Sequence, residues 1–286
     1  MRIRSYRLQT TLVIFGTKSH WIRMLFIRIS ANRNRFLDKC EVWSPERLLQ
    51  AGFASQCPDI SLNEQGVGFW AWKPFIIAEA LRDSREGDIV IYNDVGRTDI
   101  KMFRTRFEPA FEWMAEQNQN CIPGLEIPWG GPMSQWTKRD AFVFTDSDRE
   151  DLWKSAPIQA SFSVWRNTTE TRTFVDDWCR ACSDRRLVSN DANICGLPNM
   201  PDFTAHRHDQ SVLSLLCRKA GIKALTYGDG STPPHFPEKS LEAWMVFGGE
   251  QIPTTIVGLG LNVAAWVYYQ VEQFFRKKFP RAPHHG

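Results

Sequence analysis

The feature that most constrains the fold is a short apolar run that ends in a carboxylate. Ile89–Tyr92 is apolar and β-branched, follows the turn signal Gly87-Asp88, and leads into Asn93-Asp94-Val95-Gly96. A run of this length and composition predicts a buried strand. Ligands of open α/β sheets bind beyond the carboxyl ends of the strands. Asp94 is therefore the first candidate site residue, and Gly96 would let a ligand approach the backbone closely.

The patterns along the rest of the chain alternate between strands and helices, which predicts one α/β domain. Serine before Pro45-Glu46 is a good helix start, and Gly221 a good helix end. Cys121–Gln135 is rich in Pro, Gly and Trp and is expected to be an irregular loop, and residues 226–240 are expected to be rich in turns. Further strands are expected at Thr11–Phe15, Cys40–Trp43 and Gln159–Trp165. Helices are expected at Trp21–Phe36, Pro74–Arg82, Phe103–Gln117, Asp148–Lys154, Thr168–Cys182 and Asp209–Ala220.

Charge is distributed unevenly along the 286 residues. The chain has a net charge of +3, yet residues 1–37 carry eight Lys/Arg and no acid, and residues 275–286 carry four and no acid. The two basic ends predict an anionic membrane surface as a partner, with solvated termini as the alternative. The intervening body is acidic and would repel phosphates, so nucleic acid is not expected as a partner.

The cysteines and the apolar segments bear on location. Seven scattered cysteines are typical of a reducing compartment, and Cys179 and Cys182 are expected to pack inward from a helix rather than hold a metal. No cleavable signal peptide is expected. Ile256–Tyr269 is shorter than the ~20 residues of a spanning helix, which leaves an interfacial helix or a helix docked on the core. We expect a cytoplasmic protein, either free or peripheral on the inner membrane, with domain 1–250 and a helical and basic appendage 251–286.

Four motifs, in this order, resemble the GT-A glycosyltransferases, the nucleotide-diphospho-sugar transferases, and in particular their bacterial polysaccharide-biosynthesis members. They are Gly66–Pro74 (G-x-G-x-W-x-W-K-P), Gly87–Gly96 (G-D-I-x-x-Y-x-D-x-G), Gln159-Ala160-Ser161, and His206–Ser211 (H-R-x-D-Q-S). The resemblance implies a single GT-A domain with a mostly parallel central sheet flanked by helices. It also implies a hexosyltransferase-like enzyme that uses a nucleotide-sugar donor and a saccharide or lipid-linked acceptor.

The resemblance assigns the main chemistry to two aspartates. Asp94 matches the first acid of the family's metal site, where a divalent cation (Mn²⁺ or Mg²⁺) neutralises the leaving diphosphate. The second acid is missing, because Gly96 stands at its position. Asp94 would then hold the metal alone or with His206 or His208, or it would bind the donor ribose. Asp209 would take the acceptor proton in an inverting enzyme or orient a substrate in a retaining one. Its alternative role is that of a helix cap.

Other residues would bind the donor. Lys73 and Arg207 would contact phosphates, and tryptophans of the first motif would stack on sugar or base, although core packing is the alternative for each tryptophan. Trp136–Asp140 is expected to be an acceptor-side loop or a solvated turn. The full donor set is Gly16, Thr17, Trp70, Trp72, Lys73, Asn93, Gly96, Gln159, Ser161, Arg207 and Gln210.

Two rival functions remain from the sequence. A non-catalytic sugar-nucleotide-binding protein of the same fold is suggested by the missing acid at Gly96. A sugar nucleotidyltransferase would need a glycine-rich basic loop after the first strand, and Gly16–His20 is a poor match for it.

Overall fold

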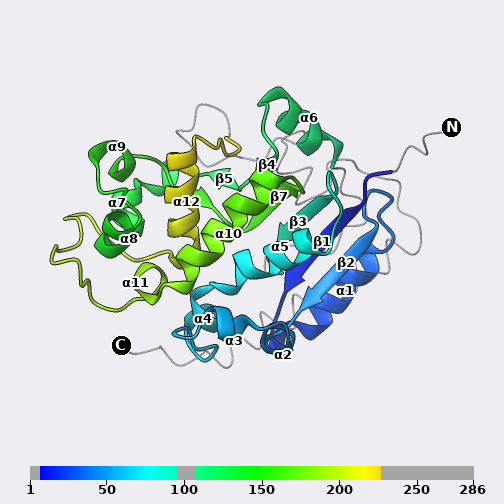
Figure 1. The fold of residues 1–286 in the computed structure, drawn as a ribbon, viewed down its shortest axis with the longest axis horizontal. Helices are drawn as coiled ribbons and strands as arrows, with labels where there is room; N and C mark the ends of the chain where they lie inside the picture. The colour runs from blue at the N-terminus through cyan, green and yellow to red at the C-terminus, as the bar shows by residue number, and fades with distance from the viewer. Residues whose placement is uncertain (1–6, 96–106, 227–286) are drawn as a thin grey trace.

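The fold is built on a five-stranded mixed sheet with strand order β2-β1-β3-β7-β4 (Figure 1). The computed structural model describes residues 7–95 and 107–226. Strand β1 runs parallel to its neighbours β2 and β3, whereas β7 runs antiparallel to its neighbours β3 and β4. The α/β class is therefore confirmed, with a parallel core of three strands and one reversed strand. The strands are β1 Thr10–Phe15, β2 Lys39–Trp43, β3 Ile89–Asn93, β4 Cys121–Ile122 and β7 Phe162–Arg166.

Helices cover both faces of the sheet because the chain turns back at β1. It passes from β1 to β2 through α1 (Trp21–Ala31), then returns over the opposite face to β3 through α5 (Trp72–Arg82). Side chains of a strand alternate between faces. Leu12 accordingly packs in the core with α1, and Val13 in the core with α5. This reversal of direction creates a crevice outside the carboxyl ends of β1 and β3, where open α/β sheets bind ligands.

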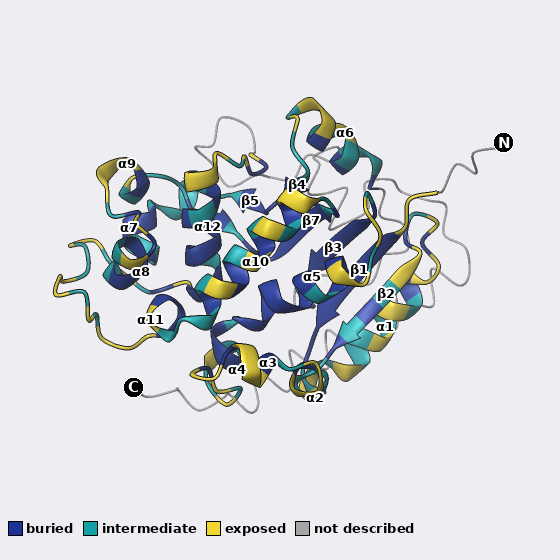
Figure 2. Cartoon of the chain, in the orientation of Figure 1, coloured by how far each residue is buried: buried dark blue, intermediate teal, exposed yellow. Residues whose placement is uncertain are grey.

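The larger of the two cores lies under α5, α10 (Thr169–Ser183) and α12 (His208–Ala220). It contains the fully buried Trp165 and Trp178, and β1 and β3 are buried along their lengths (Figure 2).

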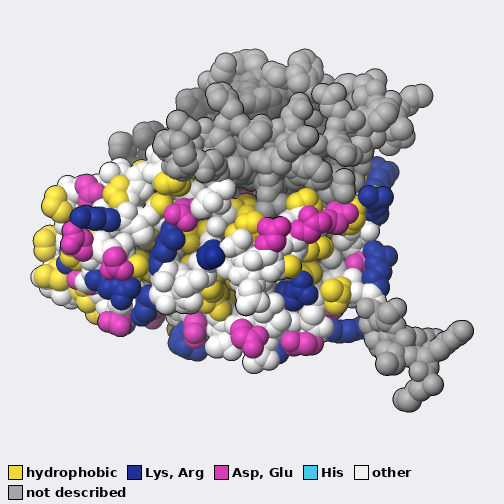
Figure 3. Space-filling model, turned by 90° about the horizontal axis from the view of Figure 1, so that it is seen from above, with side chains coloured by type: hydrophobic (Ala, Val, Ile, Leu, Met, Phe, Trp, Pro, Cys, Tyr) yellow, Lys and Arg dark blue, Asp and Glu magenta, His cyan; other side chains and the backbone are white. Residues whose placement is uncertain are grey.

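Basic and acidic side chains are intermixed on the face seen in Figure 3. The remaining elements are α6 Glu108–Glu116, η1 Lys18–His20, α2 Pro45–Gln50, α3 Phe53–Gln56, α4 Gln65–Phe69, β5 Leu125–Glu126, η3 Pro128–Gly130, α7 Met133–Trp136, α8 Arg139–Phe144, α9 Glu150–Trp153, β6 Ile158–Gln159 and α11 Arg185–Val188.

Several helix boundaries follow from local chemistry and are as predicted. The Ser44 hydroxyl accepts a hydrogen bond from the Arg47 amide (3.3 Å), with Pro45 in the first turn of α2. Thr168, with which the helix was expected to begin, caps α10 in the same way (3.2 Å), so that the helix itself begins at Thr169. Gly221 ends α12 in the left-handed conformation, with φ +66°. Cys179 and Cys182 pack inward from α10, also as predicted.

Other sequence predictions were wrong in detail. The expected loop Cys121–Gln135 contains β4, β5, η3 and the start of α7, because two-residue strands have too little periodicity to recognise. The expected strand Gln159–Trp165 is divided: β6 pairs with β5, while β7 joins the main sheet. The helix expected over Trp21–Phe36 ends at Ala31, after which the Asn34 side chain accepts from the Phe36 amide and forms a turn.

Some predictions fall on residues outside the described part of the chain. These are Gly96, the start of the helix expected from Phe103, the turns after Thr226, and the whole appendage 251–286 with Ile256–Tyr269.

No helix within residues 7–95 and 107–226 is long and apolar enough to cross a bilayer.

Candidate functional site

A cleft of about 640 Å³ lies beside the carboxyl end of β3, between the starts of α5 and α12. Its walls contain residues from all four motifs of the sequence, although these motifs are far apart in the chain. The lining residues are Gln65, Trp70, Lys73, Asp94, Ile127, Gly130, Trp136, Pro157, Gln159, Ala160, Ser161, Asn190, Ala205, His206, Arg207, His208, Asp209 and Gln210. Convergence on one cleft at the crevice of the sheet makes this the candidate site.

A lysine between two aspartates forms the charged centre of the cleft. Lys73 Nζ lies 2.8 Å from Asp209 Oδ2 and 3.9 Å from Asp94 Oδ1. The Tyr92 hydroxyl donates a hydrogen bond to Asp94 Oδ1. Lys73 and Asp209 are buried, whereas the Asp94 side chain is 30% exposed. Asp94 is therefore the carboxylate of this cluster that a ligand meets first.

Burial sets the protonation of the cluster. It raises the pKa of Asp209 to about 6, helped by the Asp94 charge and opposed by Lys73. Burial lowers the pKa of Lys73, but the two aspartates outweigh it and the net shift is upward, so the ammonium persists. Burial and Asp94 together raise the pKa of Tyr92 well above its usual value, so the phenol stays a donor.

The Lys73–Asp209 contact is an ion pair rather than a well-aligned hydrogen bond. The two atoms are in contact, yet Asp209 Oδ2 has no hydrogen-bond partner of acceptable angle among the described residues. Buried carboxylate oxygens are normally satisfied, and exceptions gather at functional sites. Asp209 is thus a buried carboxylate with a pKa near neutrality, and its contact with the Lys73 ammonium is not optimally aligned.

The position of Lys73 depends on an unusual turn that precedes it. All five residues from Gly66 to Trp70 have positive φ, including the non-glycine Val67 (59°), Phe69 (54°) and Trp70 (58°). Such a conformation costs ~1–2 kcal/mol for each non-glycine residue. A side chain at Gly66 would clash with the Trp70 ring. The G-x-G spacing of the motif is therefore required by this turn, and strain of this kind is often found at functional sites.

Trp72 anchors the turn and lies outside the cleft. Its indole N–H donates to the Gly66 carbonyl (2.9 Å), and its ring stacks on Phe15 at 3.8 Å. The ring is buried in the larger core. Trp72 was expected in the donor site. It packs in the core instead, which was the alternative considered for each tryptophan. Trp70, by contrast, lines the cleft and packs against the ring of His208 (5.3 Å).

The two histidines of the last motif make backbone contacts. His206 Nε2 lies 2.7 Å from the Leu187 carbonyl oxygen, and its Nδ1 accepts from the Lys138 amide. Both ring nitrogens are occupied, so metal binding by His206 would break one of these bonds. Burial lowers its pKa to about 3, and His206 is neutral. His208, which has φ 53°, donates from Nδ1 to the Val188 carbonyl (2.7 Å).

The candidate metal ligands are therefore few. No group of three or more His, Cys, Asp or Glu is arranged to hold a metal among the residues described. The partly exposed Asp94 fits the case in which one carboxylate and the phosphate oxygens of a ligand hold a cation.

The remaining motif residues position these groups or line the walls. The Ser161 carbonyl accepts from the Asp94 amide (2.8 Å), which ties the Gln159–Ser161 motif to the end of β3. Gln210 Oε1 accepts from the Ala160 amide (3.4 Å). The Arg207 guanidinium lies over the Trp136 ring at 4.4 Å, forming a cationic and aromatic wall.

Besides Trp72, three further described residues of the predicted donor set do not line the cleft. Gly16 and Thr17 follow β1 at the same edge of the sheet; a side chain at Gly16 would press on Met24, so packing explains the glycine. Asn93 points to the opposite face from Tyr92 and Asp94, because residues alternate along β3. Its buried Oδ1 lacks a hydrogen-bond partner among the described residues.

Sequence reasoning missed several members of the site. Tyr92 could have been found, because a residue two positions before Asp94 shares its face of the strand. Gln65 and Asn190, whose side chains bond to each other at 3.0 Å in the cleft wall, gave no signal. Of the expected acceptor-side loop Trp136–Asp140, only Trp136 lines the cleft.

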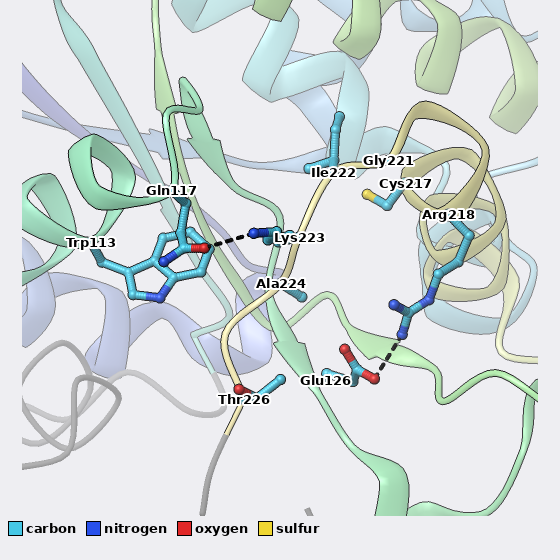
Figure 4. Close-up of a pocket in the computed structure, with 10 residues that line it drawn as sticks. All are labelled: Trp113, Gln117, Glu126, Cys217, Arg218, Gly221, Ile222, Lys223, Ala224 and Thr226. Atoms are coloured by element: carbon cyan, nitrogen blue, oxygen red, sulfur yellow. Dashed lines mark hydrogen bonds and ion pairs between the residues drawn. The ribbon is translucent and has the colours of Figure 1, made fainter.

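A second, smaller hollow of about 350 Å³ lies between α6 and the end of α12 (Figure 4). Its polar side chains pair with each other. Arg218 contacts Glu126 at 2.9 Å, and Lys223 donates to Gln117 at 3.0 Å. Glu126 neutralises Arg218, and Gln117 accepts a hydrogen bond from Lys223 without neutralising it. The residues described around this hollow therefore form no acid–base cluster comparable to the one at Lys73.

No family model matches the chain, and no curated protein matches its sequence.

Proposed function

We propose that the protein is a GT-A-type glycosyltransferase that moves a sugar from a nucleotide-diphosphate donor to a saccharide or lipid-linked acceptor. The observation that supports this most is the convergence of four separate motifs on one cleft at the carboxyl end of β3. A volume of about 640 Å³ is within the range of small-molecule sites. Asp94, Lys73 and Asp209 supply the charges that sugar transfer from a diphosphate requires.

In this proposal Asp94 faces the donor diphosphate. It would hold a divalent cation, Mn²⁺ or Mg²⁺, together with the phosphate oxygens of the donor. The cation would neutralise the charge that develops on the leaving diphosphate. The Tyr92 hydroxyl and the Ser161 carbonyl keep Asp94 oriented toward the cleft. Arg207, which lies beside Trp136, would add a second positive charge toward the phosphates.

Asp209 is the acid–base group of the proposal. A pKa of about 6 is close to the optimum for a general base at neutral pH. In an inverting reaction Asp209 would take the proton of the acceptor hydroxyl, while Lys73 balances its charge. In a retaining reaction it would orient donor or acceptor. Analysis of the anomer of the product distinguishes the two.

The test is release of nucleoside diphosphate from a panel of nucleotide sugars, with Mn²⁺ and with chelator. We expect release by the wild-type protein with one donor, and its loss in Asp94→Asn. Asp151→Asn, an exposed acid on α9, is the control for a charge change alone. Donor binding without release would instead support a non-catalytic binding protein. Pyrophosphate release from a nucleoside triphosphate and a sugar phosphate would support a nucleotidyltransferase.

A further inference from the structure

The outer face of α1 carries an exposed apolar row that the core does not use. Trp21 and Leu25, one helical turn apart, are 61% and 47% exposed, and Arg28 continues the row. Residues three or four apart on a helix share one face. The exposed segments of α1 are visible in Figure 2. A contiguous row that contains a tryptophan indicates an interaction surface, whereas a single exposed apolar residue does not.

The opposite side of α1 already anchors the helix to the sheet. Ile27, Ser30 and Ala31 are buried, and Ile27 packs with Leu12 and Ile14 of β1. Between the two sides, Ile22, Phe26 and Ile29 are half-buried and widen the apolar surface beside the exposed row. The outer row is therefore not needed to hold α1 in place, and it remains available to a partner.

The chain segment that contains this face carries charged residues of one sign. Between residues 7 and 37 the chain has six basic residues and no acid, and Arg28, Arg33 and Arg35 are exposed. No described acidic side chain lies within ion-pair distance of these three arginines. Lys18 does contact Glu46 at 3.9 Å, and Arg7 contacts Asp38 at 3.3 Å. Such exposed ion pairs contribute little free energy to stability.

We propose that the outer face of α1 docks on an anionic membrane leaflet. Trp21 and Leu25 would enter the interface between headgroups and acyl chains, and Arg28, Arg33 and Arg35 would contact lipid phosphates. Trp and Leu on one side with arginines and no acids is the composition of an interfacial helix. A nucleic acid would use the arginines but not the apolar row, so it is the poorer occupant.

Docking through α1 also orients the molecule. Trp21 follows the carboxyl end of β1, the same edge of the sheet at which Asp94 lies. This edge would then lie near the headgroups. The docking proposal itself does not depend on the proposed glycosyltransferase activity.

The experiment is co-sedimentation of the full-length protein with phosphatidylcholine vesicles, with and without phosphatidylglycerol. One variant combines Trp21→Ser with Leu25→Ser; a second combines Arg28→Gln, Arg33→Gln and Arg35→Gln. Each Lys or Arg near an anionic leaflet contributes binding free energy, and the apolar pair contributes buried area. We therefore expect the partitioning of each variant onto anionic vesicles at low salt to fall about tenfold or more. The controls are Ile194→Ser with Leu197→Ser, and Arg149→Gln with Arg180→Gln, all exposed elsewhere.

Circular dichroism and the thermal midpoint show whether each variant keeps the fold. Quenching of tryptophan fluorescence by brominated lipid, stronger in the wild type than in Trp21→Phe, would place Trp21 in the interface. The proposal is overturned if wild-type protein does not pellet with anionic vesicles. It is equally overturned if folded α1 variants pellet like the controls, or if α1 variants lose only binding to nucleic acid or to a protein.

Discussion

Two lysine–aspartate pairs are buried in the part of the chain that the structure describes, and their environments differ sharply. In the first, Lys138 Nζ lies 3.3 Å from Asp140. Asp140 also accepts from the amides of Ile194 (3.0 Å) and Cys195 (2.9 Å), and Lys138 donates to the Asp191 carbonyl (2.8 Å). Although burial raises the pKa of Asp140, these hydrogen bonds and Lys138 hold it below its usual value. This pair fastens the segment after α11 to α8.

The second pair, Lys73–Asp209, is equally buried but incompletely satisfied. Asp209 Oδ2 has no well-aligned donor among the described residues, its pKa is raised to about 6, and it faces a cleft. The comparison teaches that burial of a charge pair does not by itself indicate function. What separates a structural pair from a reactive one is the set of hydrogen bonds around the carboxylate.

The largest expected effect comes from removing each lysine, with Lys73→Met and Lys138→Met compared. Breaking a buried pair costs about 3–5 kcal/mol. In Lys73→Met, Asp209 can protonate. An aspartate with a folded pKa above its unfolded value stabilises the fold only while protonated, so stability falls as pH rises through the folded pKa.

We therefore expect the loss of stability in Lys73→Met to be smaller at pH ~5 than at pH ~8. In Lys138→Met, Asp140 keeps its two amide donors and stays ionised, so the loss should not change over this range. Urea denaturation at both pH values measures this. The distinction between the pairs fails if both variants respond to pH alike.

The next effect concerns activity. Asp209→Asn should lower turnover by at least ~10²-fold if Asp209 is a general base, while the affinity for the donor is kept. The N-cap of α12 is Arg207, so Asp209 is not the helix cap that the sequence offered as its alternative role. Its structural role is the ion pair with Lys73, and a purely structural role predicts lower stability with unchanged turnover of the folded variant. Steady-state kinetics on the folded variant decides between the roles, and a wild-type rate would remove Asp209 from the site.

The pH profile sharpens the comparison further. With Asp209 as base, kcat/KM should rise from acid pH with an apparent pKa of about 6. This acid limb should be absent in the residual activity of Asp209→Asn. An identical limb in that variant would assign the titration to another group.

The smallest effect is expected at the cleft wall. Trp70→Leu should raise KM for the donor roughly fivefold, because stacking on an aromatic ring is worth about 1 kcal/mol. Trp153→Leu is the matched control, because Trp153 lies under Arg139 near the structural pair and bonds to Asp148. Equal changes of KM in the two variants would mean that Trp70 is not a substrate contact.

The sequence predicted the separate parts of the site better than their assembly. Asp94 and Asp209 were each identified from local signals, a strand end and a polar cluster before a helix. The contact of both with one ammonium was not predictable, because Lys73 and Asp209 meet only through long-range packing, in which α10 contacts both α5 and α12. The burial of Trp72 was unpredictable for the same reason. Trp70 and Trp72 have the same local sequence signal, and only the left-handed turn places Trp70 in the cleft wall and Trp72 in the core.

The fold shows the same division. The Ser44 cap was predicted because it depends on nearby residues alone. The pairing of β5 with β6 was missed, because two-residue strands are set by their partners and not by their own pattern.

The central claim is that the cluster at the end of β3 binds a nucleotide sugar through Asp94. Calorimetric titration of nucleotide sugars with Mn²⁺ into wild-type protein and Asp94→Asn tests it most directly. We expect saturable, Mn²⁺-dependent binding of one donor to the wild type, and no Mn²⁺-dependent binding to a folded Asp94→Asn. Equal affinity of both proteins for the donor, or binding of none of the donors by the wild type, would contradict the account.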